Sequence, residues 1–265
     1  MIGGAGALII LFCAVFAPLL TPYDPSVQDT SIRLEASSPR HPLGTDQFGR
    51  DILARILFGA RSVLLVAFAS IGLGSFIGST LGVLAGYFGG VLDTVVMRLV
   101  DIGLSFPIVL LAILLVVVLG PGTTNLILAI GISQVPIFGR LSRSLVLSVR
   151  SSDFIQAAKS LGARHPRVML YHVLPNIAPV LLVQATTSLA VAILNATALN
   201  FLGLGIQPPS PDWGAMIAEF RRFVFDRPNL PFVPGAAIAV TVLCLNLLGD
   251  GLLDLLDPRW KKGVS

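Results

Sequence analysis

Long apolar segments alternate with polar stretches along this chain of 265 residues. A helix needs about 20 consecutive apolar residues to cross the hydrocarbon layer of a bilayer. About six segments approach that length, and we predict that each is a membrane-spanning helix: Ile2–Leu20, Ser62–Leu84, Leu99–Leu119, Asn125–Leu147, Ile177–Leu202 and Phe232–Leu248. The pattern therefore predicts an all-α polytopic membrane protein.

The first polar stretch, Thr21–Ala60, contains two kinds of sequence. Its first half is rich in Pro, Ser and Asp, which is typical of a loop. In its second half four apolar residues fall on one helical face, a pattern typical of a short helix lying in the membrane interface: Ile52, Leu53, Ile56 and Leu57. We therefore divide the chain into residues 1–60, with the first span and a loop carrying this interfacial helix, and residues 61–265, a five-helix core.

Glycines recur through the second predicted span at near-helical spacing, at Gly72, Gly74, Gly78 and Gly82. Small residues four positions apart let two helices approach closely in lipid. We therefore predict that this span packs closely against another helix. A short loop at Gly86–Thr94 is expected to lead into the third span.

The composition agrees with a membrane protein, because 54% of the residues are hydrophobic and 12% are charged, whereas soluble domains average about 25% charged residues. The net charge of +4 is explained better by basic loops on the cytosolic side of a membrane than by nucleic-acid binding. Cys13 and Cys244 each lie inside an apolar segment, without a CxxC or Cys/His cluster. We interpret both as packing residues rather than as disulfide partners or metal ligands.

The polar loop between the fourth and fifth spans, Ser152–Asn176, is basic, as is the C-terminal tail. The basic side chains in and beside these two segments are Arg140, Arg143, Arg150, Lys159, Arg164, Arg167, Arg259, Lys261 and Lys262. Basic loops stay on the cytosolic side of bacterial inner membranes, so we predict that the polar loop and the C-terminus are cytosolic. An even number of spans then places the N-terminus in the cytosol as well.

Local signals within the polar loop indicate a short jointed lever. Asp153 is a suitable N-cap for a helix, and Gly162 follows its last residue, where a left-handed backbone is needed. Pro166 suits the first turn of a second short helix, Arg167–His172. The Leu174–Pro175 pair would end that helix as an elbow before the fifth span.

The first of these short helices presents small and apolar side chains. Ala157 and Ala158 would let its backbone press into a partner, and Phe154 and Leu161 would serve as anchors. Two anchors make only a small contact on interface statistics. Two interpretations therefore stay open on physical grounds: a docking helix for a partner protein, or an ordinary interfacial helix with a glycine cap.

Four motifs resemble those of one protein family. The polar loop reads Q-A-A-x-x-L-G, then nine residues, then H-V-L-P, which resembles the coupling motif of ABC importer permeases, with Gln156 where that family usually has Glu and His172 where it often has Ile. His41–Asp51, Pro208–Met216 and Asn246–Arg259 also match, in the family's order. Together they resemble the C-type permease subunits of dipeptide, oligopeptide and nickel importers, and most closely the dipeptide permeases.

The resemblance implies a type I ABC importer permease that forms half of a translocation pathway for dipeptides or short peptides. It implies a second homologous permease in a heterodimer, two ATP-binding subunits that hold ATP and Mg, and an extracytoplasmic substrate-binding protein. This chain has no G-x-x-x-x-G-K-[ST] phosphate loop, so we expect it to bind no cofactor and to be no enzyme. The residues expected to couple it to the ATPase are Asp153, Phe154, Gln156, Ala157, Ala158, Leu161, Gly162, Leu174 and Pro175.

Two further groups of residues are candidates for function. Asp101, Asn246 and Asp250 are expected near the cytosolic ends of their spans, either at the inner mouth of a pathway or as ordinary helix-end groups. On the opposite side, five residues are candidates for docking the binding protein, although Trp213 could equally anchor the chain at headgroup level: Arg50, Asp51, Trp213, Arg221 and Arg222.

Other functions stay open as alternatives. The same family would accommodate a nickel chelate, haem or another small ligand as cargo. A secondary transporter or channel would need an ion site near the membrane midplane, and the predicted spans are nearly free of charge there. A membrane enzyme would need a base beside its nucleophile, but His41, His165 and His172 all fall outside the predicted spans.

Overall fold

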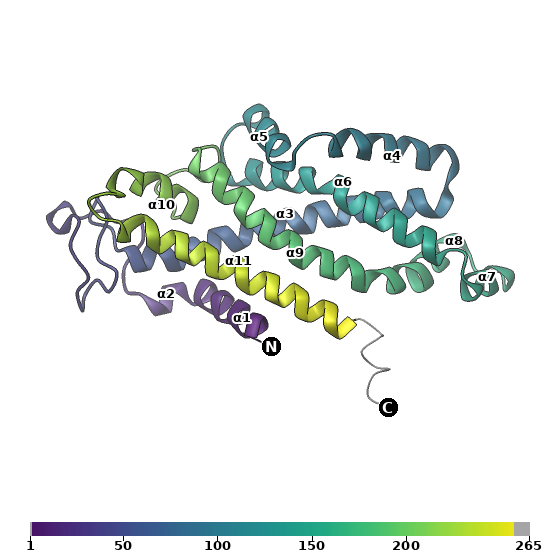
Figure 1. The fold of residues 1–265 in the computed structure, drawn as a ribbon, viewed down its shortest axis with the longest axis horizontal. Coiled ribbons are helices and arrows are strands. Elements are labelled where there is room, and N and C mark those ends of the chain that lie inside the picture. The colour runs from purple at the N-terminus through teal and green to yellow at the C-terminus, as the bar shows by residue number, and fades with distance from the viewer. Residues whose placement is uncertain (1, 257–265) are drawn as a thin grey trace.

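The computed structural model describes residues 2–256, so the tail residues Arg259, Lys261 and Lys262 lie outside the described part of the chain. Within that part every regular element is helical, and Thr45 and Asp51 form an isolated bridge. The longer helices lie side by side in an elongated bundle (Figure 1). In chain order the elements are α1 (Ile2–Val15), α2 (Ala17–Leu20), η1 (Thr30–Ile32), α3 (Ile52–Phe88), α4 (Gly90–Leu104), α5 (Ile108–Leu119), α6 (Thr123–Val149), α7 (Asp153–Ser160), α8 (His165–Val168), η2 (Met169–Val173), α9 (Leu174–Phe201), α10 (Trp213–Phe220), η3 (Arg221–Phe223) and α11 (Asn229–Leu256).

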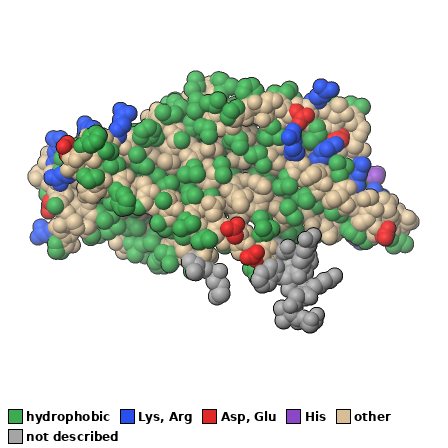
Figure 2. Space-filling model, in the orientation of Figure 1, with side chains coloured by type: hydrophobic (Ala, Val, Ile, Leu, Met, Phe, Trp, Pro, Cys, Tyr) green, Lys and Arg blue, Asp and Glu red, His purple; other side chains and the backbone are tan. Residues whose placement is uncertain are grey.

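Between residues 2 and 256, four helical segments are long and apolar enough to cross a membrane: α3, α6, α11 and the continuous segment His165–Phe201. A fifth crossing is made if the bent pair α4 and α5 counts as one span. Apolar side chains are spread over the face drawn in Figure 2, and Lys and Arg side chains gather toward its two ends. The expectation of an all-α chain of membrane-spanning helices is therefore confirmed.

The centre of the bundle is the contact between α3 and α6. A Cβ atom added at Gly74, Gly78 or Gly82 would lie only 2.6, 2.5 or 2.2 Å from a backbone oxygen of α6. No side chain fits between helices at that separation. The predicted close packing is confirmed for these three glycines, whereas Gly72 faces open space and takes no part in it.

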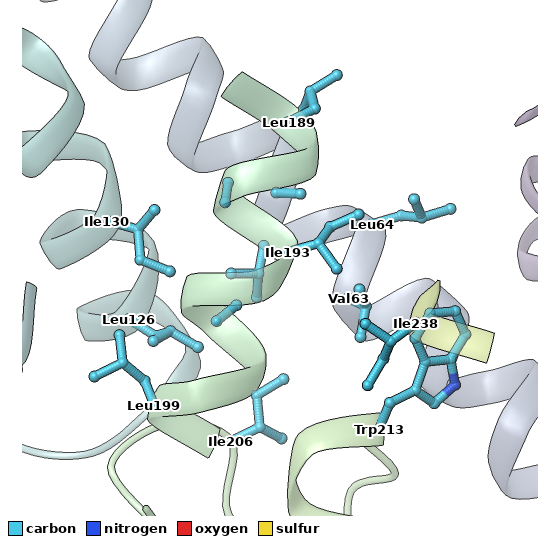
Figure 3. Close-up of a cluster of buried hydrophobic side chains, with 14 of the residues drawn as sticks. Val63, Leu64, Leu126, Ile130, Leu189, Ile193, Leu199, Ile206, Trp213 and Ile238 are labelled. Carbon is cyan, nitrogen blue, oxygen red and sulfur yellow. The ribbon is translucent and has the colours of Figure 1, made fainter. Parts of the chain in front are cut away.

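Side chains from α3, α6, α9 and α11 enclose the main apolar core. Figure 3 shows α9 beside both α6 and α3, with Ile193 directed toward Val63 and Leu64 of α3. Trp213 of α10 closes the cluster at one end. Each of the four helices covers apolar surface of its neighbours, and this shared burial fixes their mutual positions. The labelled members are Val63, Leu64, Leu126, Ile130, Leu189, Ile193, Leu199, Ile206, Trp213 and Ile238.

The prediction of a separate interfacial helix at residues 52–60 is wrong. These residues are the first turns of α3, which runs without a break for 37 residues, or about 55 Å at 1.5 Å per residue. Ile52, Ala54 and Arg55 are buried, whereas Leu53, Ile56 and Leu57 are half-buried, so one side of this segment packs against the rest of the chain. The division of the chain at residue 60 consequently falls inside α3.

The third predicted span is also wrong in outline. The segment bends by 93° between α4 and α5, because Pro107 disfavours helical backbone at the residue before it. The loop predicted at Gly86–Thr94 is replaced by a sharp corner at Gly89, whose φ is +70°. Helix α3 continues to Phe88 and α4 begins at Gly90.

The first predicted span forms two helices, α1 and the four-residue α2, with a turn at Phe16 between them. Helix α1 has 14 residues, about 21 Å, which is less than the 30 Å or so of hydrocarbon in a bilayer. It packs along α11 and α3. Cys244 of α11 fits against α1, where a Cβ on Gly6 would lie 2.4 Å from its sulfur. Both cysteines are half-buried free thiols, as packing residues should be.

Candidate functional site

The polar loop forms the tip of the bundle at the end opposite α10 (Figure 1). Ser152 is the N-cap of α7 and Asp153 is its first helical residue, so the prediction that Asp153 is the N-cap is wrong by one position. The Ser152 hydroxyl donates to the Val149 carbonyl at 2.6 Å. This bond holds the turn before α7, so the helix starts one residue earlier than predicted. The Asp153 carboxylate lies instead in the first turn, where the helix dipole favours negative charge.

The glycine cap at the end of α7 is confirmed. Gly162 has a φ of +83° and its N–H donates to the Lys159 carbonyl at 2.9 Å. The N–H of Ala163 donates to the Ala158 carbonyl at 3.1 Å, and the two bonds together form a Schellman motif. A Cβ at Gly162 would meet no atom within 4 Å, so the backbone angle alone requires glycine here.

The elbow predicted at Leu174–Pro175 is wrong. Helix α8, the π-helical turn η2 and α9 form one continuous helix, His165–Phe201, so the second short helix neither begins at Arg167 nor ends at His172. The Leu174 N–H donates to the carbonyl of Met169, five residues earlier. Because that wider turn leaves room for a ring that lacks an N–H, the helix continues through the proline.

One face of α7 carries an exposed apolar stripe, formed by Phe154, Ala157, Ala158 and Leu161. Positions i, i+3, i+4 and i+7 lie on one side of a helix. The Phe154 side chain is 46% exposed and Leu161 is 88% exposed, while Ala157 is exposed and Ala158 half-buried. The apolar stripe therefore faces away from the bundle, without a partner among the described residues.

The opposite face of α7 is anchored to the bundle through Ile155, which is fully buried. Its neighbours form a second apolar cluster, separate from the main core, with contributions from α3, α6 and the helix that follows α7. The lever is thus fixed to three long helices at once. The buried members of this cluster are Tyr87, Val146, Ile155, Val168, Val173 and Ile177.

Gln156 does not belong to the apolar stripe. Its side chain is exposed, and its Nε2 donates to the Arg150 carbonyl at 3.2 Å, at the end of α6. The Gln156 amide therefore caps a neighbouring carbonyl within this chain. Leu174 and Pro175 are exposed on the first turn of α9.

The three residues predicted at an inner mouth are not brought together. Asp101 of α4 pairs with Arg140 of α6, and both side chains are more than half exposed. Asn246 and Asp250 are exposed one turn apart on α11, which packs on α9, α1 and α10. Figure 1 shows α4 and α11 along opposite edges of the bundle, so Asp101 belongs to a different surface from the pair on α11.

A buried ion-pair network lies at the α10 end of the molecule. Arg50 Nε donates to Asp46 Oδ2 at 2.7 Å and Arg50 Nη2 to Glu219 Oε2 at 2.6 Å. Arg55 Nη1 binds the same two carboxylates at 2.6 and 2.9 Å. The two arginines and two carboxylates have a net charge of zero. A buried ion needs such a partner of opposite charge to offset the loss of water around it. Sequence reasoning missed Asp46, Arg55 and Glu219 as partners of Arg50; Asp46 lies inside the H-P-L-G-T-D-x-x-G-R-D motif, whereas Arg55 and Glu219 lie outside it.

Arg50, Asp51 and Trp213 are structural residues, so their prediction as a docking surface is wrong. They are 2%, 3% and 2% exposed. Asp51 caps α3 by accepting the Ala54 N–H at 2.7 Å, and its other oxygen binds His41 Nδ1 at 2.9 Å. The indole of Trp213 donates to the α3 backbone at 3.0 Å, so it is not a headgroup anchor.

Of the five predicted docking residues, Arg221 and Arg222 are exposed, on η3 beside the ion-pair network. They border an open cleft of about 490 Å³ that Arg50 and Glu219 also line.

Burial raises the pKa of Asp212 to about 6, while the N–H groups of Gly214 and Ala215 oppose that rise by donating to its Oδ1. Asp212 is the N-cap of α10.

The long apolar helices define a polytopic helical membrane protein, with a polar lever at one end and a closed ion-pair network at the other. Residues 78–262 match the family described as binding-protein-dependent transport system inner membrane component, and residues 1–39 match the N-terminal transmembrane domain of oligopeptide transport permease C. The chain belongs to the family of binding-protein-dependent transport system inner membrane components.

Relatives in bacteria are similar over nearly the whole chain. The dipeptide transport system permease protein DppC of Alkalihalophilus pseudofirmus is 46% identical, over 97% of this chain and 85% of the relative. The di/tripeptide transport system permease protein DppC of Pseudomonas aeruginosa is 44% identical, over 97% and 87%. The glutathione transport system permease protein GsiD of Pectobacterium atrosepticum is 41% identical, over 97% and 86%.

A solved structure shares the fold. A chain of the MetNI methionine ABC transporter, in an inward-facing conformation, superimposes with a TM-score of 0.62, covering 76% of this chain and 96% of that one. The two sequences are 19% identical. The likeness therefore shows a common helical architecture.

Proposed function

We propose that this chain is a permease subunit of an ATP-driven importer and forms half of a translocation pathway for dipeptides and other short peptides. Its membership of the binding-protein-dependent family supports an importer role. Three relatives at 41 to 46% identity are named for dipeptide, di/tripeptide and glutathione transport. Because all three named cargoes are short peptides, this cargo class has the strongest support.

The observation that carries the coupling role is the apolar stripe of α7. A helix anchored by Ile155 on one side, with Phe154 and Leu161 exposed on the other, has the anchors that a partner's groove would bury. The partner is an ATP-binding subunit, which holds the ATP and Mg. The permease transmits movement and catalyses no reaction itself.

The rest of the assembly follows from the same proposal. A second, homologous permease completes the pathway as a heterodimer, and two ATP-binding subunits bind the α7 ends. A substrate-binding protein delivers peptide at the α10 end, where Arg221 and Arg222 are exposed. In a bacterial inner membrane the α7 end then faces the cytosol, as do both termini.

Photo-crosslinking tests the docking of α7. A photoreactive amino acid at position 161, in the complex purified with its ATP-binding subunits, is expected to form a covalent adduct with an ATP-binding subunit. The matched control is position 225, since Phe225 is equally apolar and 96% exposed but lies at the other end. A crosslink to an ATP-binding subunit from position 225, with none from position 161, would refute the proposed docking.

A further inference from the structure

The last turn of α3 contacts the chain on both sides of α7. Before α7, Arg150 Nη1 donates to the Gly86 carbonyl at 2.9 Å. After α7, the Tyr87 hydroxyl and His165 Nδ1 form a hydrogen bond of 3.0 Å. From α7 itself, the Lys159 ammonium lies 5.2 Å from the centre of the Tyr87 ring, within range of a cation–π contact.

Tyr87 is the residue through which these contacts meet. Its side chain is 8% exposed and packs in the second apolar cluster with Ile155 of α7. A buried tyrosine needs a partner for its hydroxyl, and His165 supplies one from the first residue of α8. The end of α3 is thereby joined to α7 by an apolar contact and to both flanks of α7 by hydrogen bonds.

The other end of the same helix is also held by polar contacts. Asp51 caps α3, and Arg55 in its first turn binds Asp46 and Glu219. Between the two ends α3 is continuous and its glycines lie against α6. A continuous helix packed at backbone contact moves as a unit because it has no soft joint.

We propose that Tyr87 is a positioning residue, which together with Arg150 clamps the α7 lever to α3, so that α3 carries movement between α7 and the ion-pair network at the α10 end. The proposal rests on the proposed function, in which α7 contacts an ATP-binding subunit. Tyr87 touches no cargo and no nucleotide. It acts by making α7 and α3 move together.

The test uses the complete complex in proteoliposomes and measures ATP hydrolysis with and without a dipeptide-loaded binding protein. Tyr87→Phe removes one hydroxyl from the clamp, and we expect the ratio of stimulated to basal hydrolysis to fall about fivefold, the effect of one lost hydrogen bond. Tyr23→Phe makes the same chemical change at the other end and is expected to keep the wild-type ratio. A merely structural defect would lower both rates and the amount of complex together, without changing their ratio.

A double-mutant cycle assigns the effect to the bond with His165. His165→Ala should lower the ratio as far as Tyr87→Phe does, and the double variant should be no worse than either. His165→Asn, which places a polar nitrogen near the position of Nδ1, should restore most of the ratio. If the loaded binding protein stimulates ATP hydrolysis equally in the wild type and in the Tyr87→Phe variant, the positioning role of Tyr87 is overturned and the proposed function is not. A wild type without stimulation would overturn the proposed function, and this proposal with it.

Discussion

Replacing Ala158 by Asp is expected to abolish transport while leaving the chain folded and inserted in the membrane. Ala158 lies at the edge of the apolar stripe, half-buried against the bundle. If the stripe is buried in a groove of an ATP-binding subunit, the new carboxylate loses its water without gaining a partner. Such a charge costs about 3 kcal/mol or more, which corresponds to at least a 100-fold loss of the docked state.

Uptake of a labelled dipeptide by proteoliposomes measures this effect, and the amount of inserted chain is measured in the same vesicles. The control is Ser160→Asp, which adds the same charge to an exposed position of α7 outside the apolar stripe. We expect it to keep most of the transport. Normal uptake by the Ala158→Asp variant would contradict the docking of α7.

Gly78→Ala is expected to destabilise the chain markedly, because it adds a methyl group where α3 packs closely on α6. The added Cβ would lie 2.5 Å from the Val135 carbonyl oxygen and 2.8 Å from the Phe138 Cβ. The α6 backbone fixes the positions of both atoms, so the added methyl group forces α3 and α6 apart. Overpacking of this kind costs about 1–3 kcal/mol or more, and we expect an apparent melting temperature in detergent about 5 °C lower, or more.

Gly72→Ala provides the matched comparison in the same helix. Its Cβ would meet nothing within 4 Å, and alanine favours helix over glycine by up to about 1 kcal/mol. The melting temperature of this variant should therefore stay the same or rise slightly. Equal losses for the two variants would contradict the account of α3–α6 packing.

Several features were predictable because local chemistry decides them. The apolar segments predicted the helices of the bundle, although not their limits. The cap at Gly162 followed from the backbone angle that ends a helix, and the apolar stripe followed from residue spacing on α7. Gly74, Gly78 and Gly82 predicted close packing because nothing larger fits.

The features that sequence reasoning missed have two causes, which are local backbone geometry that hydropathy does not register and contacts between distant segments. Hydropathy treats residues 99–119 as one run and does not register the 93° bend that Pro107 produces. Pro175 was expected to end a short helix, but the π-helical turn before it lets the helix continue. Arg50 and Asp51 were expected at a docking surface for a binding protein, but both are buried. The Asp51 partner His41 lies in the same motif, but the Arg50 partner Glu219 comes from α10, so the burial of Arg50 depends on a contact between distant segments.

The central claim is that this chain couples ATP hydrolysis by partner subunits to the delivery of a short peptide. Its most direct test is ATP hydrolysis by the purified complex in proteoliposomes, as the substrate-binding protein is added empty and then loaded with a dipeptide. The account predicts that the loaded binding protein stimulates hydrolysis several-fold over the empty one, with dipeptide accumulating inside the vesicles. Hydrolysis that stays the same with every peptide-loaded binding protein would contradict it.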